Sequence, residues 1–198
     1  REEALDILGL PLERLVNISS AIDEQFRIAQ PTPDQEANIR KKYGIDAGYV
    51  MYTGGIDHRK NIEGLLAGFA CLPENLRSSL QLVVVCSIQS EDRARLSKLA
   101  RAHGLLAKQV VFTGFVSDAE LVALYNLAAL FVFPSLHEGF GLPLLEAMAC
   151  GVPSIGANNS SIPEVLAMPE ALFDPRSPQD MARVMGAALS DKDFAQRL

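Results

Sequence analysis

Along most of the chain, short apolar runs alternate with amphipathic segments, and this alternation limits the possible folds more than any other feature. The run LQLVVVC at 80–86 is continuously apolar and rich in β-branched residues, as in a strand buried on both faces of a sheet. The segment NIEGLLAGFACL at 61–72 instead places Ile62, Leu65 and Phe69 at helical spacing. Strands and helices are therefore expected to follow one another in turn.

The expected elements alternate at least five times, which implies right-handed βαβ crossovers. The fold class is then α/β, with a Rossmann-like open parallel sheet that carries helices on both faces. Strands are expected within 49–55, 80–86, 110–115, 129–135 and 152–157, and helices within 61–72, 90–104, 117–128, 142–151 and 177–191. Ligands bind such sheets beyond the carboxyl ends of the strands. The loops to consider are 54–61, 86–90, 113–117, 134–142 and 156–163.

Polar residues and glycines predict several helix ends. Ser90 is the expected cap of the helix that Gly104 stops. Ser117 with Glu120 three residues later forms the pattern of a capping box. Pro143 suits the first turn of the helix that follows residue 141.

Residues 1–33 show a different pattern, with a short helix-like segment, an expected strand at 14–18 and a proline-rich linker at 29–35 (AQPTPDQ). We interpret 1–33 as a crossover from a preceding domain and 34–198 as one domain. The chain begins with Arg and ends without a helix-stop signal, so a piece of a longer protein is expected.

Composition excludes several classes of function. A formal charge of −6 argues against general nucleic-acid binding, which needs clustered Lys and Arg. No apolar run approaches the roughly 20 residues that span a bilayer. Cys71, Cys86 and Cys150 form no CxxC motif, so each is expected in the core of a protein from a reducing cytoplasm. No histidine or acidic cluster suggests a metal site.

The segment TGGIDHRKN at 53–61 has the character of a phosphate site. A strand runs into Gly54 and Gly55, and Arg59 and Lys60 then precede a helix. Backbone amides at a helix start favour anions, and the two cations would add charge-assisted hydrogen bonds. The spacing matches neither a P-loop nor a dinucleotide fingerprint, and two solvated charges at a helix start remain the alternative.

A second candidate site is HEGFGLPLLEAMACG at 137–151. Gly139 and Gly141 allow the backbone to approach a ligand closely. Glu138 precedes them and Glu146 falls about one turn into the next helix, so both can face one space above the sheet. Carboxylates accept hydrogen bonds from the paired hydroxyls of ribose or a sugar ring. A tight loop with a solvated charge at each end is the alternative.

Weaker candidates lie at other strand ends. The strand-end turn in FTGFVSDAEL at 112–121 has free backbone groups that could pair with the edge of a nucleobase. The loop GANNSSIP at 156–163 offers two serines to a phosphate. Of the histidines, His103 is expected to be exposed on a helix, whereas His58 and His137 adjoin the two candidate sites.

Together these segments resemble the C-terminal, donor-binding domain of the retaining GT-B glycosyltransferases of family four, group 1. The most specific part is PSLHEGFGLPLLEAMACGVPSI at 134–155, which contains the family's Glu–seven residues–Glu signature as Glu138 and Glu146. The segments 52–69, 110–135 and 160–165 resemble further family blocks in the same order. The resemblance covers about residues 13–198.

The resemblance implies a role for each matching position. Arg59 and Lys60 would hold the donor diphosphate and stabilise the charge that develops there, so neither metal nor cofactor is expected. Glu138 would engage the sugar and Glu146 the ribose. The implied catalytic residues are Glu138, Arg59 and Lys60, and the implied donor-binding residues are Gly54, Gly55, Arg59, Lys60, Gly114, Phe115, His137, Glu138, Gly139, Phe140, Gly141, Leu142 and Glu146.

The implied reaction is sugar transfer from a nucleotide-diphosphate sugar, with retention, to a saccharide or lipid-linked acceptor. The GGIDHRKN block looks most like members that use GDP-mannose. The acceptor would bind an N-terminal domain that this chain lacks, so the chain alone is expected to be inactive. A cytoplasmic enzyme is implied, with peripheral attachment to the inner membrane face through the missing domain.

Two departures from the family pattern are present, and the first leaves open which residue is the exact partner of the phosphate. Many members have Gly-Arg where this chain has Gly54-Gly55, and the linker has Ser20-Ala21 in place of Asn-Gly. A GT-B epimerase, a phosphorylase and a non-catalytic nucleotide-sugar-binding module are the other readings. A phosphorylase would need a pyridoxal-phosphate lysine motif, which the sequence does not show.

Overall fold

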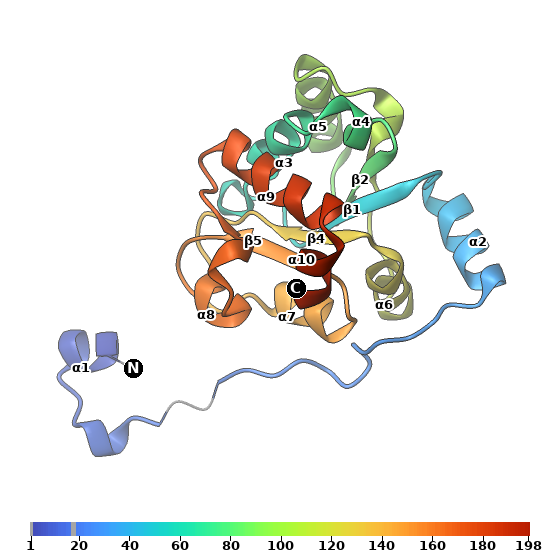
Figure 1. The fold of residues 1–198 in the computed structure, drawn as a ribbon. Coiled ribbons are helices and arrows are strands. Elements are labelled where there is room, and N and C mark those ends of the chain that lie inside the picture. Colours follow the sequence, from blue (N-terminus) through green and yellow to red (C-terminus); the bar gives the residue numbers. More distant parts are fainter. Residues whose placement is uncertain (1, 17–18) are drawn as a thin grey trace.

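The computed structural model describes residues 2–16 and 19–198, with side chains from residue 5 onward (Figure 1). Its centre is a six-stranded sheet in the order β3-β2-β1-β4-β5-β6, in which every neighbouring pair is parallel. The strands are β1 (Gly48–Thr53), β2 (Leu80–Val85), β3 (Val110–Phe112), β4 (Leu130–Phe133), β5 (Ser154–Ala157) and β6 (Leu172–Phe173). The predicted open parallel sheet is confirmed.

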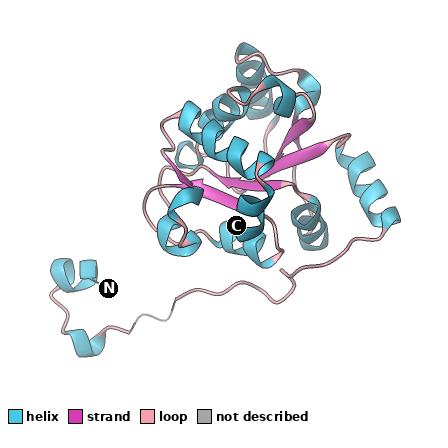
Figure 2. Cartoon of the chain, viewed as in Figure 1, coloured by secondary structure: helices cyan, strands magenta, loops and turns pink. Residues whose placement is uncertain are grey.

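Helices cover both faces of this sheet, as predicted (Figures 1 and 2). The connections that run from β1 towards β3 carry helices on one face, and those from β3 towards β6 carry helices on the other, as right-handed crossovers require. The helices are α1 (Glu2–Leu8), α2 (Pro33–Tyr43), α3 (Ile62–Ala70), α4 (Glu74–Arg77), α5 (Ser90–Ala102), α6 (Asp118–Leu127), α7 (Leu142–Ala149), α8 (Ile162–Leu166), α9 (Pro178–Ser190) and α10 (Lys192–Arg197), with 3-10 turns η1 (Leu12–Arg14), η2 (His58–Lys60), η3 (Ala107–Gln109) and η4 (Pro169–Ala171).

The chain order reverses between β1 and β4, which are neighbours in the sheet, with Val50 paired to Leu130, although they are far apart in the sequence. The loops that follow these two strands, 54–61 and 134–141, therefore leave the same sheet edge towards opposite faces. Such a reversal is where ligands bind open α/β sheets. The fold thus brings the two strongest sequence candidates together.

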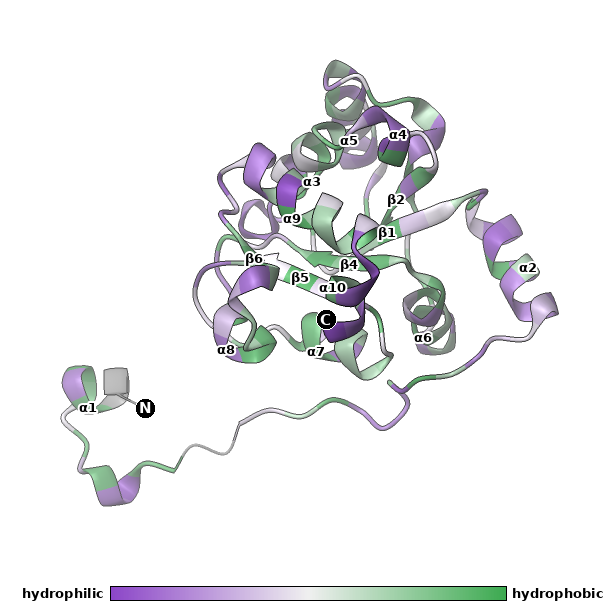
Figure 3. Ribbon diagram, viewed as in Figure 1, coloured by the Kyte–Doolittle hydropathy of each residue, from purple (hydrophilic) through white to green (hydrophobic). Residues whose placement is uncertain are grey.

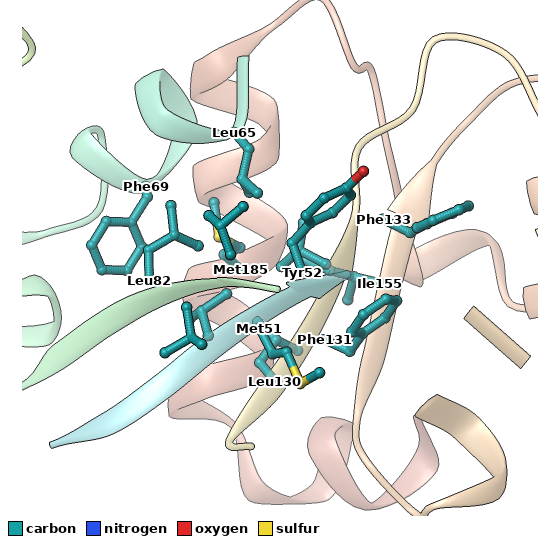
Figure 4. Packing of buried hydrophobic residues seen from close by; sticks show 14 of the residues in the cluster. Met51, Tyr52, Leu65, Phe69, Leu82, Leu130, Phe131, Phe133, Ile155 and Met185 are labelled. Carbon is teal, nitrogen blue, oxygen red and sulfur yellow. The ribbon is translucent and has the colours of Figure 1, made fainter. Parts of the chain in front are cut away.

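The core is built on the strands. Met51 and Tyr52, neighbours on β1, point to opposite faces, and Tyr52 lies on the side of Leu65 from α3 and Met185 from α9 (Figure 4). Figure 3 shows the hydrophobic colour concentrated on β4 and β5, whereas α2 is largely hydrophilic and buries only Ile39. Burial on both faces explains why the central strands read as continuous apolar runs.

Three of the four predicted helix-end signals agree with the structure. The capping box of Ser117 and Glu120 forms at α6, and Pro143 lies in the first turn of α7. Gly104 follows the end of α5 with φ 79°, as a helix stop. The cap assigned to Ser90 is wrong, because the chain is already helical there and Gln89 occupies the cap position without a side-chain hydrogen bond.

The prediction of a strand at 14–18 is wrong for the residues that are described. Leu12–Arg14 forms η1, residues 15 and 16 have no regular structure, and 17–18 lie outside the described residues. The linker assigned to 29–35 is also too long, because α2 begins at Pro33 behind a capping box formed by Thr32 and Gln35. A Thr-Pro-x-Gln sequence starts a helix for this reason. The domain division at residue 33 stays a prediction.

The last part of the linker is fixed to the domain. The amide side chain of Asn126 on α6 accepts from Ala29 N at 2.7 Å and donates to Arg27 O at 3.1 Å. Phe26 meets the ring of Tyr125 edge-on, with centroids 6.0 Å apart. Residues 26–29 therefore belong structurally with α6, while α1 lies apart from the sheet (Figure 1).

The cysteine prediction is right for two residues and wrong for one. Cys86 and Cys150 are buried, and burial raises the pKa of both thiols to about 11. Cys71 is exposed, because it is the residue that follows the last turn of α3. His103 is exposed, as expected.

Two helix glycines should respond in opposite ways to alanine. A Cβ at Gly68 would lie 2.6 Å from Met181 Sδ and 3.2 Å from its Cβ where α3 packs on α9, so Gly68→Ala should lower the free energy of unfolding by about 1–2 kcal/mol. A Cβ at Gly186 meets only Leu72 Cδ2 at 4.0 Å, so Gly186→Ala should raise it by about 0.5 kcal/mol. Urea unfolding of both variants measures this. Stabilisation by Gly68→Ala would contradict the described packing.

Candidate functional site

The candidate site lies at the carboxyl ends of β1 and β4, where two loops are joined by hydrogen bonds. Leu136 N donates to Arg59 O at 2.6 Å. The side-chain amide of Asn61, at φ 56°, donates to Pro134 O at 3.0 Å and to Pro175 O at 2.8 Å. Residue 175 lies in the loop that follows β6. The Asn61 side chain therefore holds together the loops that follow β1, β4 and β6.

The glycine turn after β1 is set by a buried tyrosine. The Tyr52 hydroxyl donates to Gly55 O at 2.7 Å. Gly54 has φ 145°, and a Cβ there would lie 2.7 Å from the Tyr52 hydroxyl oxygen. A side chain at residue 54 would therefore both strain the backbone and displace the group that shapes the turn.

The two predicted phosphate cations have different environments. Arg59 turns back to Asp57, whose Oδ1 accepts from its Nε at 3.1 Å, and the Arg59 side chain is 64% exposed. Lys60 points into the site, where its Nζ lies 2.6 Å from Glu138 Oε1. These two side chains are only 19% and 12% exposed. The structure thus joins the two candidate motifs through one largely buried ion pair.

The loop that carries Glu138 is held by the polar segment that follows β5. Glu138 N donates to Ser160 Oγ at 3.0 Å, and Ser161 Oγ donates to Phe140 O at 3.0 Å. Asn159 donates to Ser135 O at 3.2 Å. The hydroxyls that the sequence offered to a phosphate are therefore engaged in shaping the 138–140 loop.

The start of α7 faces the same region. Gly141 is its cap, with φ 99° and no side-chain hydrogen bond to the first turn. An uncapped helix start leaves backbone N–H groups that suit an anion. A Cβ at Gly139 would meet nothing within 4 Å, so a glycine there keeps space open. Leu142 and His137 are exposed beside this space.

Glu146 lies one turn into α7, as the sequence predicts. Its Oε2 accepts from the hydroxyl of Tyr125, on α6, at 3.0 Å. Burial raises the pKa of Glu146 above its ordinary value, the Tyr125 hydrogen bond opposes this, and Asp118 adds to the rise. A carboxylate in this state is a hydrogen-bond acceptor held partly away from water.

The turn after β3 lies at the same sheet edge but two strands from β1. Gly114 has φ 75°, and Phe115 is 82% exposed. The helix that follows begins at Asp118, whose charge acts on Glu146. The turn after β3 therefore leads into the helix whose first residue acts on Glu146.

Sequence reasoning missed four residues that shape the site: Tyr52, Asp57, Asn61 and Tyr125. The two tyrosines belong to a strand and a helix, where they are indistinguishable from core residues. Asp57 and Asn61 stand inside the phosphate motif, and polar residues that flank a short turn are a signal for capping. The partners of all four are visible only in three dimensions.

Two findings concern metals and membranes. Within residues 2–16 and 19–198, no three His, Cys, Asp or Glu side chains form a group that could hold a metal ion. None of the described helices combines the length and apolarity needed to cross a membrane. That the reaction needs no metal stays a prediction.

Comparison with known proteins agrees with this geometry. The family model of glycosyl transferases group 1 matches residues 35–198. The serotype-specific mannosyltransferase WbdA of Escherichia coli is 41% identical over 197 residues, which is 100% of this chain and 24% of that protein. The O-antigen chain mannosyltransferase B of the same species is 32% identical over 99% of this chain and 51% of that protein. The chain thus spans a quarter to a half of these relatives.

Solved structures show the same fold. WaaG, a glycosyltransferase involved in lipopolysaccharide biosynthesis, matches with a TM-score of 0.80 and 22% identity, over 98% of this chain and 52% of that one. Anabaena HepE, in complex with UDP and glucose, matches with a TM-score of 0.81 and 20% identity, over 99% and 53%. The architecture is therefore that of one Rossmann-like half of a GT-B fold. The chain belongs to the glycosyl transferases group 1 family.

Proposed function

We propose that the chain is the donor-binding half of a retaining glycosyltransferase that takes a sugar from a nucleotide-diphosphate sugar. The observation that carries this is the Lys60–Glu138 ion pair at the reversal point of the sheet, between the Gly54 turn and the uncapped start of α7. A buried cation next to free helix amides suits a diphosphate. A carboxylate at the same point suits sugar hydroxyls.

In this proposal each end of the site binds one part of the donor. Lys60 binds the diphosphate beside Gly139 and Gly141. Arg59 joins it once its side chain has broken the ion pair with Asp57. Glu146 accepts from the ribose hydroxyls, and the base lies towards the exposed Phe115. The remaining residues of the site, Gly54, Gly55, Gly114, His137, Phe140 and Leu142, contribute backbone and shape.

The chemical contribution of these residues is electrostatic. As the bond between the sugar and the diphosphate breaks, negative charge develops on the leaving diphosphate. Lys60, Arg59 and the α7 amides would stabilise that charge without a metal. Lys60 already has one anionic partner in Glu138, so donor binding must share or replace this contact.

We propose GDP-mannose as the donor, because both Escherichia coli relatives are named as mannosyltransferases. The acceptor would be a saccharide or a glycoconjugate, bound mainly by a preceding domain. With no spanning helix among the described ones, we propose that the enzyme acts at the cytoplasmic side, attached peripherally if its acceptor is lipid-linked.

Isothermal titration of the 198-residue chain with GDP, UDP and ADP tests the donor site. We expect each nucleotide to bind at a single site, because the proposed diphosphate and ribose contacts reside in this domain. GDP should bind most tightly, because the proposed donor is GDP-mannose. Thermal melting in parallel checks that the chain is folded. Folded protein that binds none of the three nucleotides would refute the proposed site.

A further inference from the structure

The Tyr125 side chain makes an unusual contact at the ribose end of the site. Tyr125 is fully buried on α6, and its hydroxyl lies 3.0 Å from Glu146 Oε2 and 3.1 Å from Pro143 O, both on α7. Its ring meets Phe26 and Phe131 edge-on, with centroids 6.0 and 5.6 Å away. The ring is therefore fixed between the linker and the sheet, and the hydroxyl position is fixed with it.

The hydroxyl has one proton for two acceptors. An ionised carboxylate is the stronger acceptor of the two, because its hydrogen bonds are charge-assisted. The bond uses Oε2 of Glu146, and in the described part of the chain no hydrogen bond reaches Oε1. One oxygen is thus held by the protein while the other is left for a ligand.

We propose that Tyr125 is a positioning residue, whose hydroxyl orients the Glu146 carboxylate so that its second oxygen accepts from the ribose hydroxyls of the donor. This inference rests on the proposed function, since it takes Glu146 as the ribose contact. Tyr125 itself touches no part of the nucleotide. Its role is to fix the rotation of the Glu146 side chain before the nucleotide binds. Binding then costs less conformational entropy.

The proposal also predicts how binding depends on pH. The titratable groups that face Glu146 are Tyr125 and Asp118 on α6 and Cys150 on its own helix. Ribose binding needs the ionised carboxylate, so affinity should fall as the pH drops through the raised pKa of Glu146. The Tyr125 hydrogen bond lowers this pKa, so in Tyr125→Phe the fall should begin at a higher pH.

The test compares GDP with 2′,3′-dideoxy-GDP in calorimetric titrations of the 198-residue chain and its Tyr125→Phe variant. We expect the wild-type chain to prefer GDP by about tenfold, and Tyr125→Phe to remove most of that preference while dideoxy-GDP binds as before. In a Glu146→Gln background, the same substitution should change GDP affinity by less than about twofold.

Tyr49→Phe is the matched control, because its hydroxyl is also buried and donates to a carbonyl, Leu124 O, at 2.7 Å. It should leave both affinities and the pH profile unchanged. NMR titration of the Glu146 carboxyl carbon without nucleotide gives a second readout, in which Tyr125→Phe should raise the midpoint and Tyr49→Phe should not.

Four outcomes would decide against the proposal. Equal weakening of both nucleotides by Tyr125→Phe would make Tyr125 merely structural, and so would an unchanged Glu146 midpoint. If the wild-type chain bound GDP and dideoxy-GDP with equal affinity, Glu146 would not contact the ribose hydroxyls. Failure of the wild-type chain to bind GDP, UDP or ADP would instead overturn the proposed function, and this inference with it.

Discussion

In a protein that joins this domain to the proposed acceptor-binding domain, replacing Glu138 with Gln is expected to lower turnover by about 10²–10³-fold. The substitution keeps the size of the side chain, but it removes the negative charge that lies 2.6 Å from Lys60 Nζ. Lys60 would then be free to hold the ground-state diphosphate, while the sugar would lose its carboxylate contact. Transfer of mannose from GDP-mannose to a saccharide acceptor measures the change, and kcat should fall more than donor affinity.

The control for this variant is Glu170→Gln, in η4, because its side chain is exposed and lies outside the segments that resemble the family blocks. It should leave turnover unchanged. Full turnover by Glu138→Gln with normal donor binding would favour a non-catalytic binding module. A change in the donor sugar without transfer would favour an epimerase.

Replacing Lys60 with Met should have the largest effect on the domain itself. Affinity for GDP is expected to fall by about 100-fold, because the proposed diphosphate site loses the Lys60 cation that points into it. The ligand-free chain should also lose about 2–4 kcal/mol of unfolding free energy, because Glu138 remains largely buried without a partner. Calorimetry with GDP and urea unfolding measure the two quantities separately.

A double variant separates stability from binding. Lys60→Met with Glu138→Gln removes both charges, so it should recover much of the lost stability without recovering GDP affinity. Lys42→Met is the matched control, because Lys42 on α2 forms an ion pair with Glu120 on α6 and its side chain is 56% exposed, against 19% for Lys60. It should keep GDP affinity and lose less stability. A Lys60→Met variant that binds GDP normally would exclude Lys60 from the diphosphate site.

The sequence predicted the sheet well because its signals are local. Continuous apolar runs such as 80–86 mark buried parallel strands, and the alternation with helices leaves few topologies. Helix boundaries with polar caps, such as Ser117, were also predictable. The N-terminal segment was harder, because the assigned strand at 14–18 rested on a few apolar residues without any partner for pairing.

The structure brings the predicted residues Lys60 and Glu138 into contact, but the contacts of the candidate site could not be predicted from the sequence. Arg59 and Lys60 are adjacent in sequence and chemically alike, yet one turns to Asp57 and the other to Glu138, 78 residues away. Tyr125 could not be recognised, because its single functional atom lies on a residue that otherwise packs as core. The order of the strands in the sheet determines which charged side chains lie next to each other, and no local sequence pattern encodes that order.

The Asn61 side chain has a thermodynamic consequence. One amide group joins the loops after β1, β4 and β6, so these loops have little conformational freedom to lose when a ligand arrives. Ordering such segments otherwise opposes binding by about 0.5–1.5 kcal/mol for each immobilised side chain. The proposed diphosphate end of the site is therefore preorganised, and we expect the adjustment that accompanies binding to fall mainly on the Lys60 and Glu138 side chains.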